Sequence, residues 1–179
     1  MIQQKTTPYN PVYYLPYGFA LAVMIAIVFE LRHMPALEYA GKAFSIWFMG
    51  FFPLSEIIVA VPAGMALGLS GLSVVVWSVF GNFLPIVLIH YGYENLKQIE
   101  WVNGWLEWLA SEKAKERMDR YGMWGILVLT PWIGVWAMAA TAKAFGMSGH
   151  RLMIMALISI VTYAVVIAGF ISLGLAAAG

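Results

Sequence analysis

The chain has 179 residues, of which 62% are hydrophobic and 11% are charged, with a formal net charge of +1. A soluble domain carries about 25% charged residues, so this composition indicates an integral membrane protein, with residues 1–179 as a single membrane domain. The small net charge gives no argument for binding nucleic acid, and the absence of cysteine excludes disulfides, thiolate metal sites and cysteine nucleophiles.

The first apolar run covers residues 15–31, which is just long enough to span a bilayer as a helix. The preceding residues 1–14 are polar and rich in tyrosine, which suits the headgroup level of a membrane. No small-residue cleavage site follows the run, so we expect a retained helix and not a cleaved signal peptide.

The second apolar segment, residues 43–69, contains a carboxylate and two prolines. Glu56 lies between Pro53 and Pro62. Proline ends or kinks a helix because it has no N–H to donate and clashes with the preceding turn. The arms that remain have about 9 to 13 residues and are too short to cross the bilayer. We therefore predict a re-entrant hairpin; the alternative is a kinked helix that crosses the membrane.

Residues 72–90 form the next predicted span. Gly81, Asn82 and Pro85 interrupt it near the middle of the membrane. We expect Asn82 to form a hydrogen bond with a neighbouring helix, because polar side chains link helices in this way in a bilayer. Asn82 is also a candidate for contact with a substrate.

The long polar stretch over residues 95–120 predicts a helix at the membrane surface. Trp101, Trp105 and Trp108 recur at i, i+4 and i+7, and a strongly charged sequence follows them. A helix with a tryptophan face and charged neighbours lies along a membrane interface. The alternative is a helix packed against the protein's own core. The lysines and arginines of this stretch indicate the cytoplasmic side.

The last two elements repeat the order of a broken segment followed by a span. Residues 123–147 are interrupted at Pro131 and Gly134 and carry Lys143, and residues 151–175 form the final span. We predict a second re-entrant hairpin over the first of these two elements.

The two broken segments align as an internal repeat. PLSEIIVAVPAGMALGLSG and PWIGVWAMAATAKAFGMSG share the first proline and the pattern A-x-G-x-S-G, and Glu56 aligns with Gly134. One span separates the two segments, so they would enter the bilayer from opposite faces. The sequence therefore predicts an all-α integral membrane fold, with three spanning helices, two re-entrant hairpins as an inverted repeat, and an interfacial helix.

Glu56 is the strongest candidate for a functional residue. An ionised carboxylate in a bilayer costs about 2.5 kcal/mol or more, and non-helical backbone there is also costly. A cavity in which Glu56 binds a proton or a cation, or pairs with Lys143, explains both features. The alternative is that Glu56 caps the helix that starts after Pro53. Apolar surroundings and a helix N-terminus act on its charge in opposite directions, which is why we expect proton coupling.

Two basic residues accompany this candidate. Lys143 either faces the substrate or extends to the interface, and Arg151 either anchors the last span or binds an anionic headgroup. His33, His90 and His150 lie far apart and form no short metal-ligand motif. No nucleophile–base pair is present either, so we expect no cofactor and no enzymatic activity.

Four motifs in order resemble the small multidrug export protein family. They are S-E-x(5)-P-x-G-x-A-L-G, G-N-x-x-P, E-R-x-x-x-Y-G-x-x-G and P-x-x-G-x-W…G-M, and they cover about residues 40–175. The wider DedA/VTT superfamily shares two re-entrant hairpins and implies lipid translocation, often linked to the proton gradient. By this resemblance, Glu56 matches the acid of the first hairpin, and Pro131 and Gly134 match the second break.

The chain departs from the family pattern at several positions. The export family has an arginine soon after its acid, where this chain has Ile57 and Ile58. DedA proteins carry an arginine just before the second proline, where this chain has Thr130. These departures weaken the transfer of an arginine-based grip on phosphate.

We expect a multi-pass protein of the cell membrane that translocates an amphiphilic, anionic lipid or small molecule, coupled to protons. The expected partners are membrane lipids, a lipid-phosphate substrate and protons. The sequence is also compatible with a homo-oligomer. The alternatives are a small-molecule drug exporter and a non-transporting scaffold whose tryptophan helix docks a partner.

Overall fold

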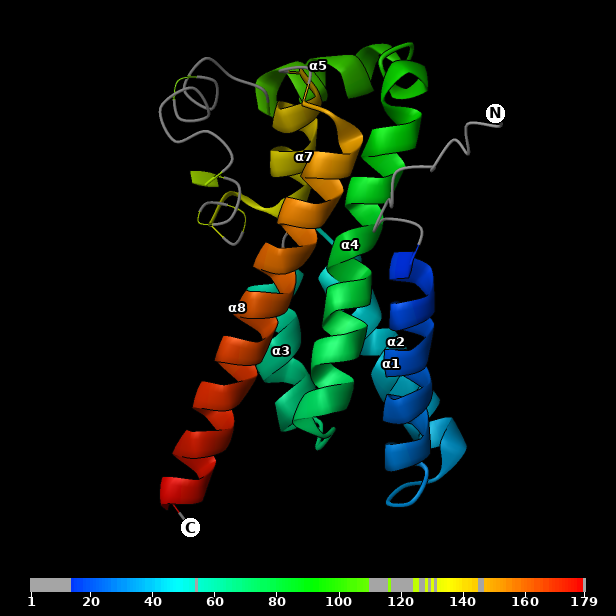
Figure 1. Cartoon of the computed structure of the whole chain (residues 1–179), viewed down its shortest axis with the longest axis vertical. Helices are drawn as coiled ribbons and strands as arrows, with labels where there is room; N and C mark the ends of the chain where they lie inside the picture. Colours follow the sequence, from blue (N-terminus) through cyan, green and yellow to red (C-terminus); the bar gives the residue numbers. More distant parts are fainter. Residues whose placement is uncertain are drawn as a thin grey trace, which may run out of the picture.

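A computed structural model describes residues 14–53, 55–109, 116, 124–125, 128, 130, 132–144 and 147–178 (Figure 1). All regular secondary structure in these ranges is helical. The helices are α1 (Leu15–Glu30), α2 (Ala36–Phe51), α3 (Glu56–Ala66), α4 (Gly71–Leu96), α5 (Glu100–Leu109), α7 (Val135–Ala144) and α8 (Gly149–Ala178).

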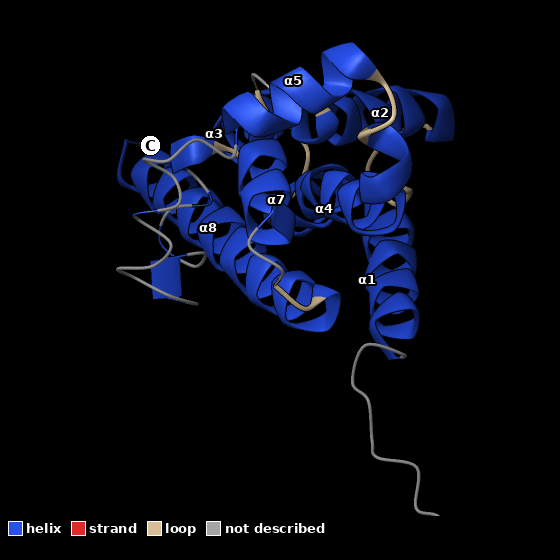
Figure 2. Ribbon diagram, turned by 90° about the horizontal axis from the view of Figure 1, so that it is seen from above, coloured by secondary structure: helices blue, strands red, loops and turns tan. Residues whose placement is uncertain are grey.

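Two helices are long and apolar enough to cross a membrane, Gly71–Leu96 and Gly149–Ala177. Their 26 and 29 residues correspond to about 39 and 44 Å, more than the roughly 30 Å of a hydrocarbon core. They run in opposite directions along the long axis of the molecule (Figure 1). α1 has 16 residues and reaches only about 24 Å. It lies at the edge of the bundle beside α4 (Figure 2).

The break in the first segment comes from a proline. α2 ends at Phe51, and Phe52 has extended backbone angles (φ −77°, ψ 131°), as expected of a residue that precedes a proline. After Pro53 the chain turns, and α3 begins at Glu56. The outer ends of α2 and α3 lie together at the end of the molecule that holds the α1–α2 turn, and their joint lies beside the middle of α4 (Figure 1).

Two predicted interruptions, one in each of the first two apolar segments after α1, are absent from the structure. Pro62 lies inside α3, so the prediction that it breaks the segment is wrong. α4 likewise continues without a break through Gly81, Asn82 and Pro85. Each proline removes only one backbone hydrogen bond from a helix that packing holds on both sides.

The second broken segment and the span after it show the same order of a short helix and a long one as the first. α7, with 10 residues, precedes α8, as α3, with 11 residues, precedes α4. α3 and α7 start close together near the middle of the molecule and run toward opposite ends (Figure 1). Of the positions that precede α7 in the second broken segment, the structure describes residues 124–125, 128, 130 and 132–134, and Pro131 lies outside the described residues.

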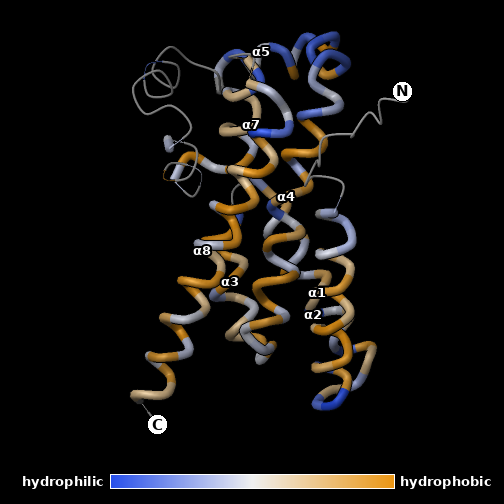
Figure 3. The backbone as a smooth tube through the Cα atoms, viewed as in Figure 1, coloured by the Kyte–Doolittle hydropathy of each residue, from blue (hydrophilic) through white to orange (hydrophobic). Residues whose placement is uncertain are grey.

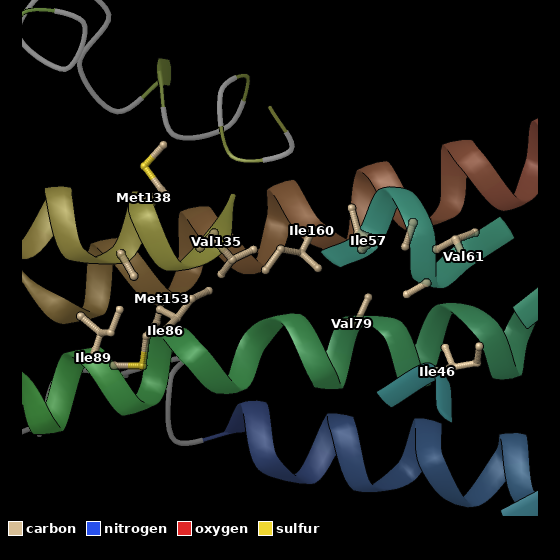
Figure 4. Packing of buried hydrophobic residues seen from close by; sticks show 14 of the residues in the cluster. Ile46, Ile57, Val61, Val79, Ile86, Ile89, Val135, Met138, Met153 and Ile160 are labelled. Carbon is tan, nitrogen blue, oxygen red and sulfur yellow. The ribbon is translucent and has the colours of Figure 1, made fainter. Parts of the chain in front are cut away.

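The core joins helices from both halves of the chain. Figure 4 shows buried aliphatic and methionine side chains from α2, α3, α4, α7 and α8 in one continuous cluster. Its labelled members include Ile57 of α3, Val79 of α4, Val135 of α7 and Ile160 of α8. Hydrophilic residues gather at the two ends, around α5 and around the α1–α2 turn (Figure 3). We call the first of these the α5 end, and the opposite one the α1–α2 end.

Candidate functional site

Glu56 is buried where the start of α3 meets the start of α7. Only 8% of the residue is exposed. Its Oε1 atom accepts a hydrogen bond of 2.9 Å from the backbone N–H of Val135, the first residue of α7. The carboxylate therefore caps α7, and no described contact makes it a cap for its own helix, α3. The alternative prediction was that Glu56 caps α3, the helix that starts after Pro53. In the structure the carboxylate caps α7 instead.

Gly134 leaves the room that the carboxylate needs. Its φ of +85° lies in the left-handed region, which glycine adopts without steric cost. A Cβ atom at this position would lie 2.5 Å from Oε1 of Glu56. The pairing of Glu56 with Gly134 in the sequence repeat is thus also a contact in space.

An indole N–H ties the same two segments together beside Glu56. Nε1 of Trp136 donates a 2.8 Å hydrogen bond to the carbonyl oxygen of Phe51, the last residue of α2. The two rings also meet edge to face, with centroids 5.4 Å apart. Ser55 holds the turn from within, because its hydroxyl donates to the carbonyl oxygen of Met49. The α2–α3 joint is therefore fixed to the start of α7 by two separate hydrogen bonds.

The backbone and the electrostatics at Glu56 are unusual. Glu56 has a φ of +39° and is the one non-glycine residue with a positive φ in the described part of the chain. Such strain, worth roughly 1–3 kcal/mol, tends to occur at functional sites. The start of α7 faces the carboxylate, and a helix N-terminus carries roughly half a positive charge. The end of this helix thus supports the buried acid.

Asn82 has a structural setting. It is fully buried in α4, and its amide donates a 2.9 Å hydrogen bond to the carbonyl oxygen of Ser78 in the same helix. The expected hydrogen bond to a neighbouring helix is not formed by this donor. Instead, the amide lies against Gly50 of α2. A Cβ atom added to this glycine would lie 2.9 Å from Nδ2 of Asn82.

Lys143 and Arg151 do not join Glu56. Lys143 lies in the last turn of α7, eight residues beyond Val135 and so about 12 Å farther along the helix. Its ammonium group lies 6.0 Å from the ring centroid of Tyr93 on α4. Arg151 is exposed in the first turn of α8. An ion pair between Glu56 and Lys143 is therefore absent from the described contacts.

The tryptophan helix is shorter in the described residues than predicted. α5 lies at one end of the molecule, across the direction of the long helices α4 and α8 (Figures 1 and 2). Trp101 and Trp108 are 76% and 72% exposed, whereas Val102 is buried. The side chain of Trp105 and most of residues 110–123 lie outside the described residues.

A second buried acid was missed by the sequence reasoning. Glu30, at the end of α1, is 2% exposed, and its Oε1 atom accepts a 2.8 Å hydrogen bond from the backbone N–H of Ser70. Ser70 is the N-cap of α4. The sequence does show a carboxylate at the end of an apolar run at this position. The same pattern is expected of an exposed residue at the membrane interface, so it did not indicate a buried acid.

A comparison with protein-family models finds one that matches residues 56–167 and is described as "Putative small multi-drug export protein". The match covers more than half of the chain, so the chain belongs to this family. No curated protein and no solved structure matches the chain. The family and the two long apolar helices together place the protein in a membrane.

Proposed function

We propose that this member of the small multi-drug export family moves a small amphiphilic molecule across the membrane, and that transport depends on the carboxylate of Glu56. The observation that carries the proposal is the buried hydrogen bond between Glu56 and the start of α7. An ionisable group buried at membrane depth is costly and marks a transport pathway in many membrane proteins.

The arrangement of the helices supports a transporter. The α2–α3 pair opens toward the α1–α2 end, whereas α7 leads from the same central region to the α5 end (Figure 1). We interpret these as parts of two re-entrant hairpins in an inverted repeat, as in the DedA-like proteins that the sequence resembles. Transporters built from inverted repeats hold their substrate at the repeat interface, near the bilayer midplane. Glu56 and Gly134 lie at that interface.

Proton binding would act directly on the contact between the repeats. An ionised carboxylate accepts a stronger hydrogen bond from the Val135 N–H than a neutral carboxyl group does. Protonation of Glu56, or its pairing with a cationic substrate, therefore weakens the link between α3 and α7. A ligand shifts a conformational equilibrium only by such differential interactions. In this mechanism, Glu56 couples proton binding to the movement of one repeat against the other.

Two observations bear on the class of substrate: the family description and the positions of the basic side chains. The family description names small-molecule export. The lipid-phosphate substrate predicted from the sequence needs a basic partner, and Lys143 and Arg151 lie away from Glu56, toward the α5 end. We therefore propose a small amphiphile as the substrate at Glu56 and treat lipid phosphate as a second substrate to be tested.

Transport by reconstituted protein tests the proposal. Wild type, Glu56→Gln and Glu56→Asp are placed in liposomes with an imposed pH gradient and either a fluorescent amphiphilic dye or a fluorescent lipid phosphate. We expect wild type to move at least one of them faster with the gradient. Glu56→Gln should fold but fall to the rate of empty liposomes, and Glu56→Asp should keep part of the activity. Wild-type rates from folded Glu56→Gln would remove the carboxylate from the mechanism.

A further inference from the structure

One face of α2 carries a row of aromatic rings that leads toward the joint where α3 begins. Phe44, Phe48 and Phe52 recur every fourth residue along α2 and its C-cap, and so lie on the same face. Neighbouring rings in this row are nearly parallel, with interplanar angles of 21° and 25° and centroids 6.3 and 5.9 Å apart. The three residues are 62%, 47% and 44% exposed. We call them the outer row.

A second row of rings lies beside the first and ends next to Glu56. Trp47 and Phe51 of α2 stack with an interplanar angle of 9° and centroids 5.9 Å apart. Phe51 in turn meets the ring of Trp136 edge to face, and Trp136 directly follows the residue whose N–H donates to Glu56. The two rows are connected, because the ring centroid of Phe44 lies 5.5 Å from that of Trp47. We call Trp47, Phe51 and Trp136 the inner row.

The aromatic character of this face distinguishes it from the exposed surface of the last span. On α8, the exposed large hydrophobic side chains are aliphatic with the exception of Phe170. On α2 and its C-cap they are Leu37 and the three phenylalanines of the outer row. Contact with lipid chains requires only apolar side chains, whereas stacked rings also offer flat faces with a negative electrostatic potential. The two rows therefore provide a surface that suits a flat, positively charged molecule.

The region where the two rows end also favours a positive charge. Within the described ranges, the one ion pair joins Lys42 to Glu38, so no described basic side chain neutralises Glu56. The starts of α3 and α7 contribute about one unit of positive charge in total, and the end of α2 contributes about half a unit of negative charge. An ionised carboxylate therefore leaves this region negative.

A buried amide oxygen lies at the level of the same joint. Oδ1 of Asn82 has no hydrogen-bond partner among the described residues, although the residue is fully buried. The side chain lies against Gly50 of α2, the residue before Phe51 of the inner row. An oxygen without a donor in a buried place is unfavourable, and a nearby positive charge reduces that cost. Asn82 thus adds to the attraction for a cation.

We propose that the two aromatic rows select a flat aromatic cation as the substrate of Glu56 and guide it along α2 to the carboxylate. Flat rings stack on aromatic side chains, and a cation is attracted to the face of an aromatic ring. The outer row follows α2 from the α1–α2 end to the joint beside the middle of α4 (Figure 1), and the inner row continues to Trp136 beside the carboxylate. This inference rests on the proposed transport function and adds the chemical class of the substrate and the residues that recognise it.

Binding to the full chain in detergent tests this recognition separately from transport. The probes are N-methylacridinium, which is a flat aromatic cation, acridine at alkaline pH, which is the same ring system without charge, and tetrabutylammonium, which is a cation without rings. Isothermal titration calorimetry measures the affinities. We expect wild type to bind N-methylacridinium most tightly. Phe48→Leu removes the middle ring of the outer row but keeps an apolar side chain. It should weaken binding of N-methylacridinium by roughly threefold to tenfold and leave the affinity for tetrabutylammonium unchanged.

The matched control is Phe170→Leu, which removes an exposed phenylalanine of α8 outside both rows, and it should bind N-methylacridinium like wild type. Should Phe48→Leu fail to fold, Phe44→Leu, at a more exposed position of the same row, replaces it with the same expected loss. The proposal is wrong if wild type binds acridine or tetrabutylammonium as tightly as N-methylacridinium, or binds none of the three. It is also wrong if the outer-row variant binds like Phe170→Leu, since the row then contacts lipid alone.

Transport in liposomes separates a failure of this inference from a failure of the proposed function. Transport of a dye that depends on Glu56, without a preference for N-methylacridinium in detergent, would overturn the inference and leave the proposed function intact. Binding of N-methylacridinium that depends on the outer row, without transport of any probe, would support the recognition site and overturn the proposed function.

Discussion

At the scale of single residues, the centre of the molecule depends on a carboxylate and a glycine that lie far apart in the sequence. Glu56 has a positive φ and reaches across to the start of α7, and Gly134 has the backbone angles and the missing side chain that admit it. Neither residue has an evident role without the other. Replacing the glycine therefore tests the contact while leaving the carboxylate in the chain.

Gly134→Ala should lower both stability and transport. Alanine in the left-handed region costs about 1–2 kcal/mol, and its Cβ atom would displace the Glu56 carboxylate from a position 2.5 Å away. Thermal unfolding in detergent and transport in liposomes measure the two effects. Gly169→Ala, in α8 with nothing within 4 Å of the added Cβ atom, is the control. A Gly134→Ala protein with unchanged stability would show that this backbone geometry is not required.

At the scale of elements, α2 and α4 approach so closely that glycine is needed on both helices. A Cβ atom at Gly50 would lie 2.8 Å from the carbonyl oxygen of Ser78, and one at Gly81 would collide with the backbone of Trp47. Small residues at helix contacts of this kind are usual in membrane bundles, where close backbone approach supplies much of the attraction.

Gly50→Ala should destabilise the bundle by about 1–3 kcal/mol, the usual cost of inserting a methyl group into a packed site. Gly41→Ala, in the same helix with nothing within 4 Å, should be neutral or stabilising, because alanine favours a helix more than glycine does. The difference between the two thermal unfolding midpoints gives the contribution of the contact. Equal midpoints would mean that α2 and α4 can separate at no cost.

At the scale of the whole molecule, the ends of the helices divide into two groups. The α1–α2 turn, the start of α4 and the end of α8 lie at the α1–α2 end, and α5 lies at the other end (Figure 1). If α1 crosses the membrane together with α4 and α8, the chain has three spans and its termini face opposite sides. The lysine-rich region at the α5 end then faces the cytoplasm.

Cysteine labelling measures this topology directly, because the chain contains no cysteine of its own. We expect cysteines placed at Gln3 and at the exposed Glu107 of α5 to react with a membrane-impermeant reagent only from the cytoplasmic side. A cysteine at Gly179 should react only from outside. Labelling of Gln3→Cys from outside would instead support broken segments that cross the membrane completely.

The amino-acid sequence by itself determined the features that depend on local chemistry. A high apolar content indicates a membrane protein, and the restriction that Pro53 places on the backbone of the preceding residue agrees with the end of α2. The ordered motifs around Glu56 led to the family. These properties are written in composition and in neighbouring residues, so no knowledge of the fold was needed to predict them.

Only the tertiary structure decided which groups meet. Val135 as the donor to Glu56, Ser70 as the donor to Glu30, and the collision of any side chain at Gly149 with His90 all join residues far apart in the chain. The continuity of α3 through Pro62 was also decided there. Long-range packing sets these contacts, and it overrides local preferences when the surrounding helix supplies enough other hydrogen bonds and buried surface.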